Sequence, residues 1–324
     1  MGNEIVPGIH RIEAPLGDRV VCVFVLVGER GTLLIDTGLD AIIPDYVVPY
    51  LARLGLAPGH VRYVLTTHAD MDHMGGNAAM RARAPHALFM CHRLDQVWIE
   101  DVEKLIGENY GQFKDSHGVA DDQGTNDWIR SAAKGTAMDM GLSGGERLSL
   151  GTDWWLEIWH TPGHTRGHVS VFDPRSRTMI IADAALYNGL YTANGAPAFP
   201  PTYRFVNAYV STIQRLQAAP IETLLTSHYQ VKRGAEVREF LAESLAFVNR
   251  LDTAVQQVIQ SAGGAISMKH VLDRLDGNVG GWPSSANSLL IYPVAGHVER
   301  LLESGLIQAA QSEGVTVYTW QKSD

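Results

Sequence analysis

Histidine and aspartate residues directly follow short apolar runs at four separate places in this sequence. The runs and the residues that follow them are Arg62–Thr67 with His68, Asp70, Asp72 and His73, Trp154–Trp159 with His164, Thr178–Ile181 with Asp183, and Ile221–Leu225 with His228. Each run has the composition of a buried strand. Loops that leave the same edge of a sheet converge, so we expect these side chains to meet at one point. This requirement restricts the chain to a layered α/β fold.

The rest of the first half supports that fold class. Residues 20–27 form a continuous β-branched and aromatic run, a Gly28–Gly31 turn follows, and residues 32–35 are again apolar, which predicts a buried hairpin. Residues 43–54 and 206–218 have apolar positions at helical spacing. Strands and helices therefore alternate along the chain.

Two segments differ in character from this pattern. Residues 94–134 are charged and helical, with Trp98 and Trp128 among their aromatic residues, and we expect an inserted helical lid. From residue 233 onward the sequence predicts helices to 260, at 266–275 and at 284–304, followed by strand-like runs at 306–309 and 315–320. The predicted organisation is a catalytic domain over 1–232 and a small winged-helix-like domain over 233–324.

The composition restricts the binding partners and the metal ligands that the chain can have. With 26 Lys and Arg against 35 Asp and Glu, the net charge is −9, and an acidic chain is a poor general binder of nucleic acid. Cys22 and Cys91, the two cysteines of the chain, cannot form a thiolate zinc site, so any metal must be held by histidine and carboxylate. The absence of a leader-like start or of about 18 uninterrupted apolar residues predicts a cytoplasmic protein without membrane partners.

The order of these motifs resembles that of the metallo-β-lactamase-fold hydrolases, including the glyoxalase-II-like and lactonase-like members. The resemblance covers about residues 5–230 and rests on His68-x-Asp70-x-Asp72-His73, the Thr-Pro-Gly-His164 loop, the lone Asp183 and His228, and Leu34-Ile-Asp36-Thr-Gly38. It implies a four-layer αββα sandwich. It also implies that His68, Asp70 and His164 hold one divalent ion, that Asp72, His73 and His228 hold a second, and that Asp183 bridges them.

Asp70 stands where the family usually has histidine. Flavodiiron proteins, which share the fold, have a glutamate there, so a carboxylate is compatible with metal binding. With Asp70 as a ligand, two divalent ions, three carboxylates and one hydroxide sum to zero charge; zinc is then the expected ion, with manganese or iron(II) as competitors. In the alternative hypothesis, Asp70 only hydrogen-bonds its neighbours and the site holds a single metal.

The remaining residues receive roles by position. Asp72 and Asp183 are the predicted catalytic residues, and Asp36, His160 and His168 are expected to support the ligands, although the two histidines have a purely structural alternative. His117, Tyr187 and Phe199 are expected to line a partly apolar substrate pocket. The sequence shows no cluster of basic residues near the motifs.

The resulting hypothesis is a binuclear metallo-hydrolase that cleaves an ester, lactone, thioester or related acyl bond of a small molecule through a metal-bound hydroxide. One alternative is a redox diiron protein of the flavodiiron kind, against which no flavin phosphate loop is seen in the C-terminal third. Another is a nucleic-acid-binding protein that uses the winged helix, although Glu299 and Glu303 accompany His297 and Arg300 on its last helix. Similar C-terminal domains cap the active site or join subunits, so a homodimer is left open.

Overall fold

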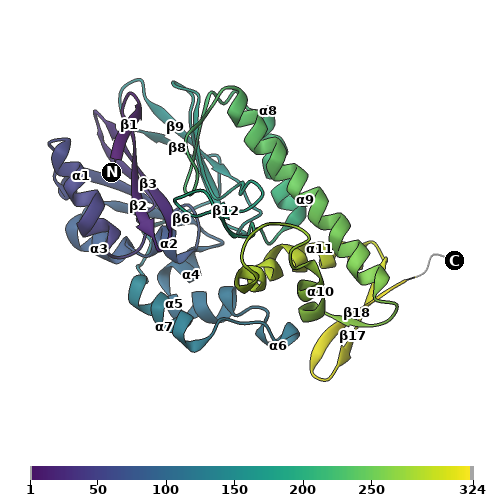
Figure 1. Cartoon of the computed structure of the whole chain (residues 1–324). Helices are drawn as coiled ribbons and strands as arrows, with labels where there is room; N and C mark the ends of the chain where they lie inside the picture. The colour runs from purple at the N-terminus through teal and green to yellow at the C-terminus, as the bar shows by residue number, and fades with distance from the viewer. Residues whose placement is uncertain (1, 322–324) are drawn as a thin grey trace.

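The computed structural model describes residues 2–321 and contains two stacked sheets (Figure 1). The first sheet has the strand order β1 (Gly2–Val6), β2 (Ile9–Leu16), β3 (Arg19–Gly28), β4 (Gly31–Ile35), β5 (Val61–Leu65), β6 (Leu88–His92) and β7 (Met140–Leu142). The second has the order β15 (Lys232–Arg233), β14 (Thr223–Thr226), β11 (Thr178–Ala182), β10 (Val169–Asp173), β9 (Trp155–His160) and β8 (Arg147–Ser149).

Strand β3 shows why this sequence forms a sandwich. Its residues are buried on both faces, which explains the continuous apolar run. Phe24 and Leu26 belong to a cluster that also contains Ile158 and Val171 of the second sheet. Val23 and its alternate neighbours pack instead on the helix side of the sheet. One face of β3 thus packs against the helix layer, and the other packs against the second sheet.

Helices cover both outer faces. The first sheet is covered by η1 (Ile43–Val47), α1 (Val48–Arg53) and α3 (Asn77–Arg83), and the second by α8 (Val206–Ala218) and α9 (Ala235–Ser261). Two short helices, η2 (Pro58–His60) and α2 (Met71–Met74), lie in the connections of the first half. The predicted four-layer αββα architecture is therefore confirmed.

The segment between β6 and β7 is helical, as predicted for the lid. It contains α4 (Gln96–Glu100), α5 (Val102–Lys104), η3 (Leu105–Tyr110), α6 (Lys114–His117) and α7 (Gln123–Ala132), which lie together below the sheets in Figure 1. A small antiparallel pair, β12 (Leu190–Tyr191) and β13 (Pro197–Phe199), follows Asp183.

The C-terminal segment contains α9, α10 (Met268–Leu275), η4 (Ser284–Leu290) and α11 (Ile291–Glu303), with the hairpin β17 (Ile307–Ser312) and β18 (Val315–Trp320). A short strand, β16 (Ile266–Ser267), adds to β18 and makes a three-stranded sheet. Helices and hairpin lie where the sequence predicts them; the winged-helix assignment and the domain boundary at 232 stay predictions. One hydrophobic cluster runs from β11 through α8 and α9 to β18, so this segment shares a core with the sandwich.

None of the helices within residues 2–321 is long and apolar enough to cross a membrane.

Candidate metal centre

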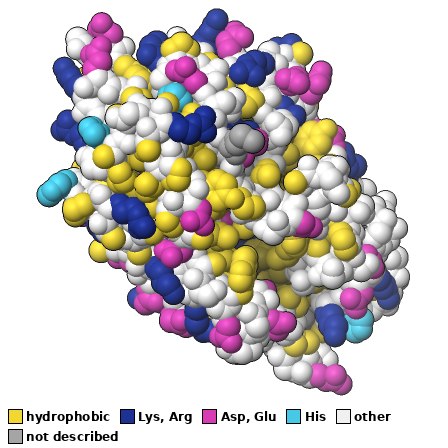
Figure 2. Space-filling model, turned by 60° about the vertical axis from the view of Figure 1, so that its left-hand side comes forward, with side chains coloured by type: hydrophobic (Ala, Val, Ile, Leu, Met, Phe, Trp, Pro, Cys, Tyr) yellow, Lys and Arg dark blue, Asp and Glu magenta, His cyan; other side chains and the backbone are white. Residues whose placement is uncertain are grey.

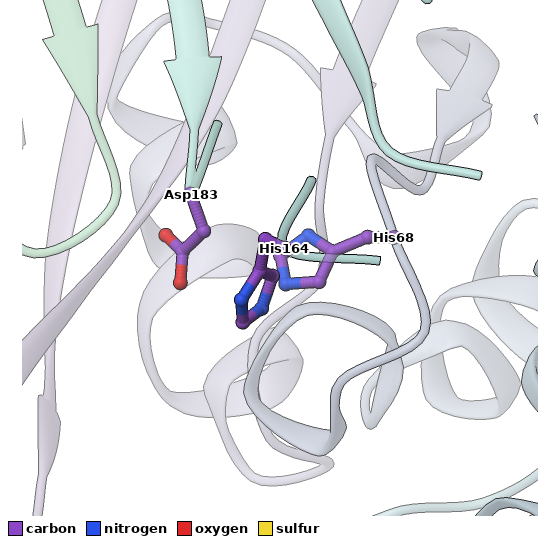
Figure 3. Close-up of side chains that lie close together, drawn as sticks. All are labelled: His68, His164 and Asp183. Carbon is purple, nitrogen blue, oxygen red and sulfur yellow. The ribbon is translucent and has the colours of Figure 1, made fainter. Parts of the chain in front are cut away.

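The four groups of histidine and aspartate residues meet at one edge of the sandwich. They follow β5, β9, β11 and β14 and form two sets. One set contains His68, His164 and Asp183, and the other contains Asp72, His73 and His228. Within each set the ligand atoms lie within 4.8 Å of one another. Figure 3 shows the first set, in which Asp183 at the end of its strand faces two imidazoles from separate loops. The two sets divide the candidates as the family resemblance implies, apart from Asp70.

The four histidines have their imidazoles held through Nδ1. The partners of Nδ1 are Thr67 Oγ1 at 3.0 Å for His68, Asp36 at 2.9 Å for His73, the Thr202 carbonyl at 3.2 Å for His164 and the Val20 carbonyl at 2.9 Å for His228. A proton on Nδ1 leaves the Nε2 lone pair available. Metal-binding histidines are commonly oriented in this way by an outer partner.

Asp36 positions both halves of the site. One carboxylate oxygen accepts the Thr67 N–H at 2.7 Å, and the other accepts the Thr67 hydroxyl and His73 Nδ1, each at 2.9 Å. Because Thr67 Oγ1 also contacts His68, one buried carboxylate orients histidines of both sets. Asp36 adopts a left-handed backbone (φ 60°), a conformation that aspartate tolerates better than most residues and that is often found at functional sites.

The orphaned atoms of the cluster show that its residues fit a cation. His68 Nε2, His73 Nε2 and Asp183 Oδ1 are buried without a hydrogen-bond partner. Leaving such groups unpaired is costly, and each of them is a metal ligand when deprotonated. Imidazole nitrogen and carboxylate oxygen suit zinc, manganese and iron(II) alike.

Asp183 and Asp70 occupy different places in the cluster. Asp183 belongs to the first set, and its Oδ2 also lies 3.2 Å from His228 Nε2 and 3.7 Å from His73 Nε2 of the second, so the residue lies close to both sets, as a bridging ligand would. Asp70 Oδ2 lies 2.8 Å from His164 Nε2 and 3.5 Å from His68 Nε2. Its other oxygen accepts the Tyr110 hydroxyl at 3.2 Å. The Asp70 carboxylate therefore faces the first set, and its role as a ligand stays a prediction.

The electrostatics of the cluster favour bound positive charge. Burial lowers the pKa of His73, but Asp72, Asp183 and Asp36 outweigh it and raise that pKa to about 10. Burial raises the pKa of the Asp183 carboxyl, but His228 and His73 outweigh it and hold that pKa well below its usual range. The clustered carboxylates thus stabilise cations at their centre.

The histidines predicted to support the ligands separate into two cases. His168 is buried, its ring stacks on that of His68 with centroids 4.8 Å apart, and its Nε2 accepts the Asp183 N–H at 3.2 Å. His160 instead stacks on His92 at 4.2 Å, and its Nε2 contacts the Arg166 carbonyl. The contacts of His160 match the structural alternative.

Asp95 is a site residue that the sequence analysis missed. Its buried carboxylate accepts Ala69 N–H at 3.1 Å, the Thr165 hydroxyl at 2.6 Å and Gly167 N–H at 2.7 Å. It thereby ties the His68 loop to the His164 loop. The available signal was its position just after β6, a strand that the sequence analysis did not predict.

A cavity of about 840 Å³ opens over the cluster. Its lining includes Asp72 and Asp183 together with residues of the lid, of the β12–β13 segment and of η4 and α11. Trp98 and Trp128 of the lid are among them. Figure 2 shows one face of the molecule on which hydrophobic side chains gather around a hollow.

The three predicted pocket residues lie in different places. Phe199 lines the cavity, but His117 and Tyr187 are not among the lining residues of the described chain. The Tyr187 ring stacks on Phe240 of α9, and the His117 ring packs between Phe113 and Tyr318. The Tyr187 ring therefore packs against α9, and the His117 ring joins the inserted helical segment to β18.

The sequence shows no cluster of basic residues near the motifs, but the fold brings three arginines to the cavity. Arg19, Arg166 and Arg204 line the cavity. They lie far apart in the sequence, so no basic cluster is visible until the chain folds.

Comparison with known proteins agrees with this geometry. A family model described as the metallo-beta-lactamase superfamily matches residues 16–228. The hydroxyacylglutathione hydrolase of Thermosynechococcus vestitus is 24% identical over 155 residues, which are 48% of this chain and 47% of that protein. The corresponding protein of Aeromonas hydrophila is 27% identical over 199 residues, 61% of this chain and 56% of the relative. The chain thus spans about half the length of these curated relatives.

A solved structure extends the similarity of fold to the whole chain. A metallo-beta-lactamase family protein from Thermus thermophilus has a TM-score of 0.76 and 19% identity, with 98% of this chain and 100% of that chain covered. The shared fold therefore includes the C-terminal segment.

Proposed function

Because the chain belongs to the metallo-beta-lactamase superfamily, we propose that it is a binuclear metal-dependent hydrolase of an ester, thioester, lactone or related acyl bond. The observation that supports this most strongly is the convergence of four Nδ1-anchored histidines and three carboxylates at the base of a cavity. The relatives named hydroxyacylglutathione hydrolase act, by that name, on a thioester, which places acyl transfer to water first among the candidate reactions.

The ligands would divide as the two sets indicate. His68 and His164, with Asp70, would hold one ion; Asp72, His73 and His228 would hold the second, and Asp183 would contact both. Bound divalent ions supply a water that ionises near neutral pH and a Lewis acid for a carbonyl oxygen. Zinc is the first choice, with manganese or iron(II) as alternatives.

The chain's own residues would orient the reaction. Asp36 and the backbone carbonyls keep the Nδ1 atoms that they contact protonated, so that each Nε2 stays a lone-pair donor. Asp72 lines the cavity and its side chain is 16% exposed, so its carboxyl can reach a leaving group and return a proton to it. The exposed Trp128 and the cavity-lining Phe199 favour an apolar or aromatic part of the substrate.

The last helix of the C-terminal segment supports this proposal over duplex binding. His297 is buried and its Nδ1 contacts Asp252 at 2.8 Å, while Arg300 lies 3.3 Å from the same carboxylate. Tyr292 of that helix lines the cavity. The helix therefore presents Tyr292 to the cavity and His297 to the core, which agrees with a capping role.

The test is hydrolysis by protein that has been stripped of metal and reloaded. Aryl ester, thioester and lactone substrates would be assayed beside an aryl phosphodiester, with zinc and manganese in turn. We expect acyl turnover that disappears with a chelator, returns with metal and is abolished by Asp183→Asn. Acyl turnover that survives both chelation and Asp183→Asn would contradict the proposal.

A further inference from the structure

The β2–β3 turn places one cationic side chain beside the metal-binding cluster. Arg19 is the first residue of β3 and pairs with Leu16 across the turn. The next residue, Val20, accepts His228 Nδ1 through its carbonyl at 2.9 Å. The backbone at Arg19 is thus fixed relative to a metal-site histidine, and its side chain lines the same cavity as Asp72.

The Arg19 guanidinium is oriented but incompletely paired. Its central carbon lies 4.1 Å from the centroid of the Phe199 ring, which fixes its plane. The Nε atom is buried without a hydrogen-bond partner. The Asp18 carboxylate is 3.6 Å from Nε, beyond hydrogen-bond length, and that side chain is 71% exposed, so solvent weakens the pair.

The electrostatic surroundings of Arg19 depend on the metal site. Burial lowers the pKa of Arg19, and the attractions of Asp72 and Asp18 offset this only in part. Arginine nevertheless stays charged, because its normal pKa lies so far above neutrality. Once cations neutralise Asp72 and its neighbours, the Arg19 charge has no equal counterpart nearby.

The other arginines of the cavity differ in this respect. Arg204 forms a bidentate pair with Glu299, at 2.8 and 2.5 Å. Arg166 is solvent-exposed and lies over the Phe205 ring at 4.9 Å. The lid adds Glu108, which accepts the Trp98 indole N–H at 3.1 Å, and the exposed Asp121. An anion is therefore favoured near Arg19 rather than near the lid.

We propose that Arg19 binds an anionic group, such as a carboxylate, of the acyl substrate and so determines specificity. Its planar donors match two oxygens of a carboxylate, while apolar surface around Trp98 and Trp128 takes the rest of the molecule. The substrate class is then an ester or thioester with a free acidic group in its acyl or leaving part. This inference deepens the hydrolase function proposed above and rests on it.

The first test measures binding without turnover. Zinc-loaded wild type, Arg19→Gln and Arg166→Gln are titrated calorimetrically with 3-phenylpropane-1-sulfonate, whose sulfonate is a weak metal ligand, and with the uncharged 3-phenylpropyl methyl sulfone. We expect wild type to bind the sulfonate about ten- to hundredfold more tightly than the sulfone, as for a charge-assisted pair. Arg19→Gln should remove that preference and the matched Arg166→Gln should keep it within about twofold.

A second variant distinguishes loss of anion binding from loss of folding. Arg19→Lys keeps the charge but loses the paired planar donors, so it should show an intermediate preference at an unchanged melting temperature. Equal binding of both probes by wild type, or an unchanged preference in Arg19→Gln, would overturn the proposal.

Kinetics separate this proposal from the proposed function. We expect mono-p-nitrophenyl glutarate to be preferred over p-nitrophenyl butyrate by wild type, with Arg19→Gln raising KM for the anionic ester about ten- to hundredfold and leaving the neutral ester within about twofold. If neither ester is hydrolysed but the sulfonate preference depends on Arg19, the anion site stands and the hydrolase function fails. If both esters are hydrolysed at the same ratio by wild type and variant, the anion site is wrong and the hydrolase function stands.

Discussion

Replacing Asp36 by asparagine tests how far the metal site depends on one buried carboxylate. The carboxylate is 0% exposed and accepts three hydrogen bonds, from Thr67 N, Thr67 Oγ1 and His73 Nδ1, at 2.7, 2.9 and 2.9 Å. Asparagine has nearly the same shape and tolerates the left-handed backbone, so the fold should survive. One carboxylate oxygen, however, is replaced by an NH₂ group, which faces the hydrogen-bond donors of Thr67 or His73 and cannot accept from them.

The substitution changes which nitrogen of the His73 imidazole carries the proton. If the amide oxygen keeps the Thr67 N–H, the NH₂ group meets His73 Nδ1, which can then pair only as an acceptor. The imidazole proton moves to Nε2, the atom that faces the metal position. Loss of such an outer partner lowers metal affinity by about 10- to 100-fold, or about 1.4–2.8 kcal/mol.

Asp173→Asn is the matched control. Its carboxylate is also buried and accepts Trp154 Nε1 at 3.2 Å and the Ser176 hydroxyl at 2.6 Å, but none of the predicted ligands is among these partners. Each variant should lose about 1.5–3 kcal/mol of unfolding free energy, since each removes a charged acceptor. Competition with a chromophoric chelator should show weaker zinc binding for Asp36→Asn alone. Zinc affinity within about twofold of wild type, or an equal loss in Asp173→Asn, would refute the reasoning.

Three further predictions follow from other parts of the structure. Asp70→His should raise the preference for zinc over manganese in competition binding, because imidazole replaces a hard oxygen beside His164; an unchanged preference would place Asp70 outside the ligand set. For Asp252, the His297 hydrogen bond holds the pKa of the carboxyl below its usual value, so the pair stabilises the fold above about pH 4 and this stabilisation is lost as the pH falls through the lowered pKa. Asp252→Asn should therefore unfold more easily than wild type at pH 7, with a difference that shrinks below about pH 4, and a constant difference across that range would argue against this origin. The intact chain should show no salt-sensitive binding of duplex DNA in a gel-shift assay, because Arg300 is paired with Asp252; binding at physiological ionic strength would revive the nucleic-acid hypothesis.

The sequence predicts the ligand-bearing strands well because their signal is local. The strands before Asp183 and His228 are buried throughout, and the strand before His68 is buried at Val61, Val64 and Leu65. All three are therefore mostly apolar and are recognisable without knowledge of their partners. The edge strand β1 is more polar and partly exposed, and β7 and β8 are three residues each, so these strands lack such a signal.

Contacts between distant segments could not be predicted in the same way. Arg19 precedes His228 by more than 200 positions in sequence, yet the Val20 carbonyl and the His228 ring are hydrogen-bonded. Tyr187 follows Asp183 closely, which suggested a pocket wall, but the left-handed backbone at Tyr187 (φ 50°) accompanies a ring stacked on α9. Position along the chain therefore predicted which histidines and aspartates converge, but only part of the wall of the cavity.

The number of ions bound at saturation tests the central claim most directly. Metal-free protein would be dialysed against increasing zinc and its metal content determined by elemental analysis beside His73→Ala, which removes one member of the second set. The two ligand sets predict two ions per chain for wild type and one tightly bound ion for the variant. A single ion per chain in saturated wild-type protein would contradict the binuclear site.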